Sequence, residues 1–146
     1  MAATATAYNC LWKYMMDNTV QLLTDDIKVA LVSSSYAPDA DHGEWADASA
    51  AEITGTGYTA GGAALTGKSV TLDGAVAKFD ADDASWPGLT ATFRRAIVYA
   101  NVTRNGKTNP LIAHVLLDST DVDIVCSAVN YLVVWSESGI ISLTAA

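Results

Sequence analysis

The fold of this chain is decided by the stretch Lys68-Ser69-Val70-Thr71-Leu72-Asp73-Gly74-Ala75-Val76-Ala77-Lys78-Phe79. Polar and apolar residues alternate from Ser69 to Asp73, which is the period of a half-buried strand, and a mostly apolar run follows Gly74. An Asp-Gly pair between two such runs is a strong signal for a tight hairpin turn. The stretch therefore predicts two antiparallel strands, at residues 68–72 and 75–79.

The residues just before this hairpin match two phosphate-binding motifs. Residues 62–69 match G-x-x-x-x-G-K-S, and residues 55–60 match G-x-G-x-x-A. Both motifs bind an anion only where the glycine-rich loop leaves a buried strand and opens a helix, whose N–H groups hold the phosphate. Here a strand follows Lys68, and residues 46–54 are Ala-rich, polar and acidic. We therefore expect a glycine-rich loop packed into a β domain, with no nucleotide and no other cofactor.

Three further hairpins are expected along the chain. Their strands are residues 20–23 with 27–33, residues 93–102 with 111–117, and residues 129–135 with 140–144. The second of these encloses Asn105-Gly106, another tight-turn signal. Four hairpins with short turns favour a mainly β fold, either an antiparallel β-sandwich or a jelly-roll-like barrel.

One short helix is expected at the N-terminus, over residues 7–17. A helix of this length is marginal alone, so its apolar face must pack on the sheet or on a sister subunit. The residues at helical spacing are Tyr8, Leu11, Trp12, Met15 and Met16.

Two irregular stretches complete the expected single β domain, residues 1–146. The first is a long Gly/Ala/Asp-rich loop over residues 37–67, with an edge strand at Tyr58-Thr59. Structureless loops of this length are usually functional or form interfaces. The second covers residues 80–89, where Trp86-Pro87-Gly88 predicts a turn.

Composition excludes several classes of partner. The chain has 146 residues, 51% of them hydrophobic and only 16% charged, with a net charge of −8 and a sequence pI near 4.4. A phosphate backbone and an anionic membrane would be repelled, so we expect no nucleic acid and no membrane as partner. A surface of neutral small residues is typical of a protein that packs against copies of itself or a large partner.

Cysteine usage and the N-terminus indicate the compartment. Cys10 and Cys126 are the only cysteines, which gives neither a zinc site nor a disulfide framework. The N-terminus lacks the features of a signal peptide, and no stretch approaches the length of a membrane span. Folding in a reducing cytoplasm is expected.

No residue pattern marks a catalytic or metal site. The acidic run of residues 39–47 begins like a calcium loop but has Glu44 where that loop needs Gly and Ala50 where it needs Glu. A solvated acidic loop is the preferred interpretation, and likewise for Asp80, Asp82 and Asp83. The two histidines, His42 and His114, have no motif around them, although a triad assembled in space stays open. We expect no catalytic residue, no metal and no enzymatic activity.

The aromatic residues are the candidates for an interface. We expect most of them to lie in the core with a polar tip near the surface. Trp45, in its acidic Ala-rich loop, is either a lid over the core or an interface anchor. The predicted interface residues are Trp12, Trp45, Tyr58 and Trp86.

Several blocks of the chain, in order, resemble a family of small structural proteins of tailed bacteriophages. The blocks are residues 27–39, 45–47, 52–65, 79–83 with Trp86, 95–99, 110–113 and 139–143. The similarity runs from about Tyr8 to Thr144. In this family the glycine block looks like loop architecture, and the family pattern carries no catalytic residues.

The resemblance implies a capsid decoration, or cement, protein that is made in the cytoplasm of the host bacterium. It would bind the major capsid protein on the outer capsid surface and assemble with copies of itself, with three as the expected number. Two alternatives stay open: a tail or fibre component of the same particle, and a carbohydrate-binding module that uses Trp45 and Trp86 as exposed sugar platforms.

Overall fold

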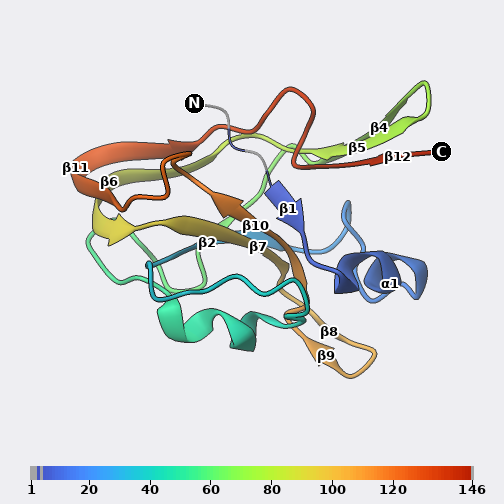
Figure 1. Cartoon of the computed structure of the whole chain (residues 1–146), viewed down its shortest axis with the longest axis horizontal. Coiled ribbons are helices and arrows are strands. Elements are labelled where there is room, and N and C mark those ends of the chain that lie inside the picture. The colour runs from blue at the N-terminus through green and yellow to red at the C-terminus, as the bar shows by residue number, and fades with distance from the viewer. Residues whose placement is uncertain (1–2, 4, 146) are drawn as a thin grey trace.

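The computed structural model describes residue 3 and residues 5–145. Within these residues the chain is mainly β, with one α-helix, several antiparallel sheets and no closed barrel (Figure 1). The predicted mainly β fold is confirmed, and the architecture is consistent with the sandwich alternative. The elements are β1 (Ala5–Ala7), α1 (Cys10–Met16), β2 (Ile27–Val32), the 3₁₀ turns η1 (Trp45–Asp47) and η2 (Ser49–Ala51), β3 (Ala63–Ala64), β4 (Ser69–Asp73), β5 (Val76–Asp80), β6 (Ala84–Phe93), β7 (Arg95–Ala100), β8 (Thr103–Arg104), β9 (Lys107–Thr108), β10 (Leu111–Leu116), β11 (Ile124–Val133) and β12 (Ile141–Thr144).

A five-stranded sheet in the order β1-β10-β7-β2-β3 forms the middle of the molecule. β7 lies between β2 and β10 and is antiparallel to both. All side chains of β2 except Lys28, and all of β7 except Arg95, are buried. A continuous apolar run is the sequence of a strand covered on both faces, and both faces of this sheet are covered.

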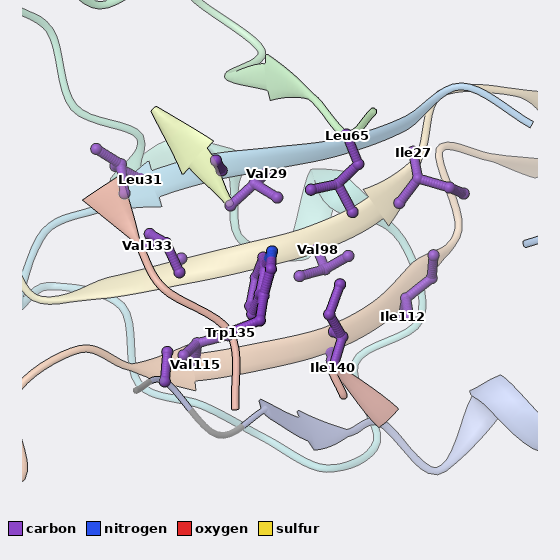
Figure 2. Close-up of a cluster of buried hydrophobic side chains, with 14 of the residues drawn as sticks. Ile27, Val29, Leu31, Leu65, Val98, Ile112, Val115, Val133, Trp135 and Ile140 are labelled. Carbon is purple, nitrogen blue, oxygen red and sulfur yellow. The ribbon is translucent and has the colours of Figure 1, made fainter. Parts of the chain in front are cut away.

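One face packs on a second layer, which consists of the β6–β11 ribbon and the three-stranded sheet β12-β5-β4. Figure 2 shows side chains of β2, β7 and β10 pointing toward Val133, Trp135 and Ile140. The Trp135 Nε1–H donates to the carbonyl oxygen of Asp82 at 3.2 Å, so the buried indole has its hydrogen bond.

The other face is covered by the first part of the long loop rather than by a sheet. Trp45 opens η1 and stacks on Tyr99 of β7, with ring centroids 4.9 Å apart and planes 8° from parallel. Only 8% of Trp45 is exposed. Trp45 is therefore a lid over the chain's own core, which is one of the two roles that the sequence left open.

The glycine block of the long loop runs directly against neighbouring backbone. A Cβ on Gly62 would lie 2.0 Å from the carbonyl oxygen of Val29, and one on Gly55 would lie 2.1 Å from that of Thr90. No side chain fits at either place, so these glycines serve packing on β2 and β6. The predicted edge strand at Tyr58-Thr59 is wrong. The edge strand of this loop is β3 instead. The Tyr58 side chain turns inward and accepts a hydrogen bond from the Leu31 N–H at 3.1 Å.

Two predicted hairpins are confirmed. β4 and β5 pair in register, with a loop at Gly74-Ala75, one residue later than expected. β7 and β10 pair around a small β8–β9 hairpin that turns at Asn105-Gly106, both with positive φ.

The other two hairpins are wrong in different ways. Residues 20–25 form turns and no strand, because Asp25 folds back and accepts the Gln21 N–H at 2.8 Å. The last two strands exist, but β11 pairs with β6 and β12 pairs with β5. The expected turn at residues 80–89 is wrong too, since β6 runs through Pro87. A register irregularity against β11 at this point accommodates the proline.

The N-terminal helix is shorter than predicted. It begins at Cys10 rather than at residue 7, because Ala5–Ala7 pair with β10 as β1. Its buried residues are Leu11 and Tyr14, whereas Met15 and Met16 are 40% and 88% exposed. Packing of the predicted face is confirmed for Tyr8 and Leu11, which are fully buried. Met15 is not covered by the sheet, and its packing on a sister subunit stays a prediction.

Candidate functional site

The sheet β12-β5-β4 has one apolar face and one polar face. Residues opposite each other in antiparallel strands share a face, and the register places the apolar ones in two rows. The first row is Val70–Phe79–Ile141 and the second is Leu72–Ala77–Leu143. The opposite face carries Ser69, Thr71, Asp73, Lys78 and Ser142.

The two rows differ in what covers them. In the first row Phe79 and Ile141 belong to the main core, at 3% and 9% exposure. In the second row Leu72 is 74% and Leu143 54% exposed. The sheet therefore extends past the core, and no described residue covers the part of its apolar face at Leu72 and Leu143.

The helix α1 borders the same overhang (Figure 1). A hollow of about 470 Å³ lies between Leu143 and the helix residues Trp12, Met15 and Met16. A second hollow of about 500 Å³ lies between Met15, residues 20–24 and Val70. We call these surroundings the arm surface, formed by Trp12, Met15, Met16, Leu23, Val70, Leu72, Ala77 and Leu143.

A contiguous group of exposed apolar side chains marks a binding site more often than chance exposure does. Methionine adapts its shape to a partner, which suits it to such surfaces. The arrangement can bind an apolar partner surface, and it contains no group that would act as an acid, a base or a nucleophile.

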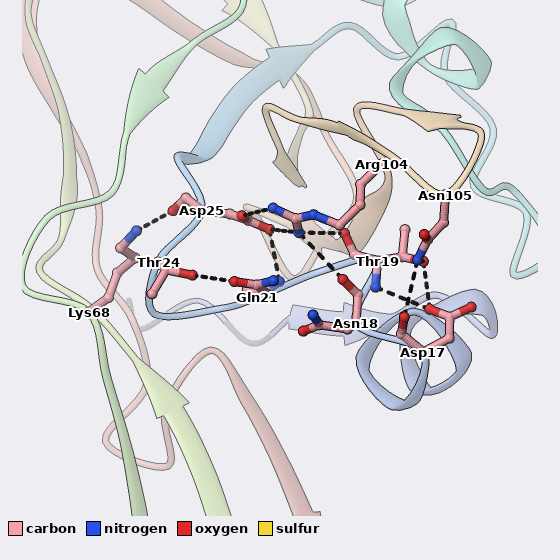
Figure 3. Close-up of polar contacts among 9 residues, drawn as sticks. All are labelled: Asp17, Asn18, Thr19, Gln21, Thr24, Asp25, Lys68, Arg104 and Asn105. Carbon is pink, nitrogen blue, oxygen red and sulfur yellow. Dashed lines mark hydrogen bonds and ion pairs between the residues drawn. The ribbon is translucent and has the colours of Figure 1, made fainter.

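A polar network holds the border of this surface in place (Figure 3). Arg104 donates to both Asp25 oxygens, at 2.9 and 3.0 Å, and to the carbonyl oxygen of Thr19 at 3.0 Å. The Asn105 amide donates to the carbonyl oxygen of Asp17 at 3.1 Å. These bonds tie the turns after α1 to the β8–β9 hairpin, so the floor of the second hollow is anchored.

Asp25 is the buried centre of the network, with 5% of its side chain exposed. Burial alone would raise the pKa of its carboxyl. The hydrogen bonds from Arg104 and from the Gln21 N–H outweigh burial, so the pKa lies below its usual range. The Lys68 ammonium donates to the Asp25 backbone carbonyl oxygen. The lysine of the P-loop-like motif thus has an internal partner, and strand β4 rather than a helix follows it, as predicted.

Two acidic residues of the long loop, Glu44 and Asp47, accept backbone N–H groups. Asp47 accepts the N–H groups of Gly43 and Glu44 at 2.9 and 3.0 Å, which hold the pKa of its carboxyl below the usual range. Glu44 accepts the Thr108 N–H at 2.8 Å. Within the described part of the chain no cluster of side chains has the make-up of a metal site.

Both histidines lie near Tyr8, His42 through a chain of hydrogen bonds and His114 through a ring contact. His42 Nδ1 is 3.0 Å from the Tyr36 hydroxyl, which is 2.6 Å from that of Tyr8. His114 lies with its ring edge to Tyr8, and burial followed by the nearby Arg95 charge lowers its pKa. No hydrogen bond in residues 5–145 joins a serine to either histidine. The described residues therefore do not form the Ser-His contact that a catalytic triad needs.

Of the four predicted interface aromatics, the structure brings Tyr58 and Trp86 together, with ring centroids 6.5 Å apart, whereas Trp12 and Trp45 lie elsewhere. Trp45 and Trp86 are buried at 8% and 3% exposure, so neither offers the exposed sugar platform of the carbohydrate-binding alternative. Trp86 lies between Tyr58 and Tyr131. The Tyr58 hydroxyl donates to Glu52 at 2.7 Å beneath the glycine block. Only Trp12 lies on the arm surface, where its interface role stays a prediction.

Leu72 and Leu143 of the arm surface were not predicted as interface residues. Their alternation with polar residues was visible, but it indicates only which face is apolar. Whether that face is covered depends on how far the sheet extends past the core.

Comparisons of the chain with family models, with curated proteins and with solved structures find no match. The resemblance to phage structural proteins accordingly stays a prediction. In the described residues no helix is both long enough and apolar enough to span a bilayer.

Proposed function

We propose that this chain is a non-enzymatic structural protein of a tailed-bacteriophage particle, which decorates the capsid and stabilises it by bridging neighbouring major capsid subunits. The proposal places the protein on the outer capsid surface after synthesis in the bacterial cytoplasm. A protein that binds only the mature shell favours that shell by mass action.

The observation that carries the proposal is the arm surface. It offers apolar side chains on a sheet that is anchored in the core at one end and free at the other. Such a surface suits lasting contact with a large partner. The order of sequence blocks, from about Tyr8 to Thr144, supports a virion partner in particular.

The polar side chains support a non-enzymatic role. Two carboxylates of the acidic run of residues 39–47, those of Glu44 and Asp47, accept hydrogen bonds from backbone N–H groups. Groups engaged in this way stabilise loops, and the arm surface offers no reactive group of its own.

The test is binding of the purified chain to heads assembled without it. Met16→Ser and Leu143→Ser both alter the first hollow, and we expect each to lower occupancy by about tenfold, since each removes an apolar contact worth roughly 1–2 kcal/mol. Val125→Ser is the matched control, because Val125 is 74% exposed on β11, away from the arm surface.

Equal occupancy by the parent and both arm variants would overturn the role of the arm surface. Binding to tails rather than heads would favour the tail or fibre alternative, and retention on a glycan array would favour the carbohydrate-binding one.

A further inference from the structure

Strand β4 has a free edge of unusual composition. It is an outer strand of its sheet and pairs only with β5 among the strands of the described chain. All five of its residues are exposed. Because ladder hydrogen bonds alternate, every second residue of β4 directs its N–H and C=O away from β5.

Natural edge strands are usually protected against pairing with another chain by charges, proline or a bulge. β4 has none of these between Ser69 and Leu72, and its register with β5 is regular throughout. Two other outer strands differ from β4. β11 has register irregularities between Cys126 and Tyr131, and β12 lies against β1.

We propose that the β4 edge pairs antiparallel with β4 of a second copy of this chain, about a twofold axis at Thr71. In that register Val70 lies opposite the second copy's Leu72, and Thr71 lies opposite its own equivalent. Opposite residues share a face, so the apolar pairs fall on the apolar face and the threonines on the polar face.

Charge favours this register. The chain carries a net charge of −8, so most twofold contacts would bring like charges together. Here the one charged residue of the strand, Asp73, lies opposite the second copy's Ser69. The strand Ser69–Asp73 is thus complementary to itself in polarity, and it places no like charges opposite each other.

The hollow beside β4 fits the same occupant. It is lined by Val70, Met15 and residues 20–24 and has a volume of about 500 Å³. In the proposed register the second copy's Leu72 lies directly opposite Val70, on the face where this hollow opens. A stable interface buries about 800 Å² per partner, and an edge strand combined with the adjoining apolar side chains contributes more area than the edge alone.

This pairing does not rest on the proposed virion role. It uses the β4 side of the arm surface, whereas the head-binding test alters the Leu143 side. It predicts a twofold dimer as the unit in solution and so competes with the trimer expected from the sequence.

The test is the mass of the purified chain by sedimentation equilibrium, in the parent and in a variant that introduces a charge at the axis. In the Thr71→Glu variant the new carboxylate lies opposite Lys78 of its own sheet, which favours folding. At the dimer axis the same substitution places two carboxylates opposite each other. We expect dimer dissociation to rise by about tenfold or more. Thr144→Glu is the control, since Thr144 is exposed on the same polar face but on β12.

The decisive measurement is an equimolar mixture of Thr71→Glu and Thr71→Lys chains. Opposite charges then meet at the axis, and the dimer should return although each variant alone is monomeric. Circular dichroism of each variant checks that it is folded. A parent chain that is monomeric at its highest soluble concentration, a trimer, or a dimer indifferent to Thr71→Glu would each overturn the inference.

Discussion

Strands β2 and β4 are both short and built largely from β-branched or other apolar residues, yet they have opposite surroundings. β2 is paired on both edges and covered on both faces, so Ile27, Val29 and Leu31 are fully buried. β4 is paired on one edge, and all its residues are exposed. Two strands of similar propensity thus occupy different environments, β2 in the core and β4 at the surface.

The difference separates stability from binding within one small chain. Apolar side chains in the central sheet contribute folding free energy because they leave water when the chain folds. Leu72 and Leu143 remain in water in the isolated chain, so they contribute little until a partner covers them. Substitutions in the two regions should therefore affect different measurements.

The largest expected effect is that of Trp45→Ala, on the covered side of the comparison. Removing an indole that is 8% exposed and stacked on Tyr99 leaves a cavity, and we expect unfolding free energy to fall by about 3–5 kcal/mol. Urea unfolding of the isolated chain measures it, with Trp45→Phe as the milder control. Unchanged stability together with reduced head binding would restore Trp45 as an interface anchor.

A pair of identical substitutions tests the comparison directly. Leu31→Ala should lower the unfolding free energy by about 2–5 kcal/mol, because Leu31 is fully buried. Leu72→Ala should change it by about 0.5 kcal/mol or less, since Leu72 is 74% exposed. Equal losses in urea unfolding would mean that the arm folds as part of the core.

How much of this fold could be predicted follows from the kind of signal each element carries. The β4–β5 and β8–β9 turns were readable because Asp-Gly and Asn-Gly restrict the backbone locally. The partners of β11 and β12 were not, because strand pairing across a sandwich is decided by packing between distant segments. Pro87 predicted a turn and lies in a strand, since a register irregularity removes the need for its missing N–H.

The candidate site was less predictable than the fold. The prediction favoured large aromatics as interface residues, but large aromatics are also the side chains that gain most from burial. Trp45 and Trp86 are accordingly buried, while the arm surface consists mainly of methionine, leucine and valine. Exposure depends on where the core ends, and no local pattern encodes that.

A moderate effect is expected at the network that joins the two regions. Asp25→Asn removes the anionic partner of Arg104 and should cost about 1–3 kcal/mol at pH 7. The folded pKa of Asp25 is lowered, so its contribution is full above the unfolded pKa of about 3.9 and is lost as pH falls through the folded pKa. The parent and variant unfolding curves should therefore converge below about pH 4.

The control for this pH series is Asp73→Asn, which alters an exposed carboxylate on β4. We expect it to stay within about 0.5 kcal/mol of the parent. A parent–variant difference for Asp25→Asn that is constant from neutral to acidic pH would contradict the role of the ion pair.

Among the substitutions expected to lower stability, Lys68→Ala, just before β4, should have the smallest effect. The Lys68 ammonium donates to the Asp25 backbone carbonyl oxygen, a part-buried hydrogen bond whose loss should cost about 0.5–1.5 kcal/mol. Lys78→Ala is the matched control, because its ammonium donates to the Glu137 carbonyl oxygen at an exposed site, at 2.9 Å. Head binding should be unchanged in both, since neither ammonium belongs to the arm surface. Isothermal titration calorimetry with ATP distinguishes this structural role of Lys68 from the phosphate binding that the P-loop-like motif would imply. Micromolar binding that Lys68→Ala abolishes and Lys78→Ala preserves would show that the glycine loop holds phosphate without a helix behind it.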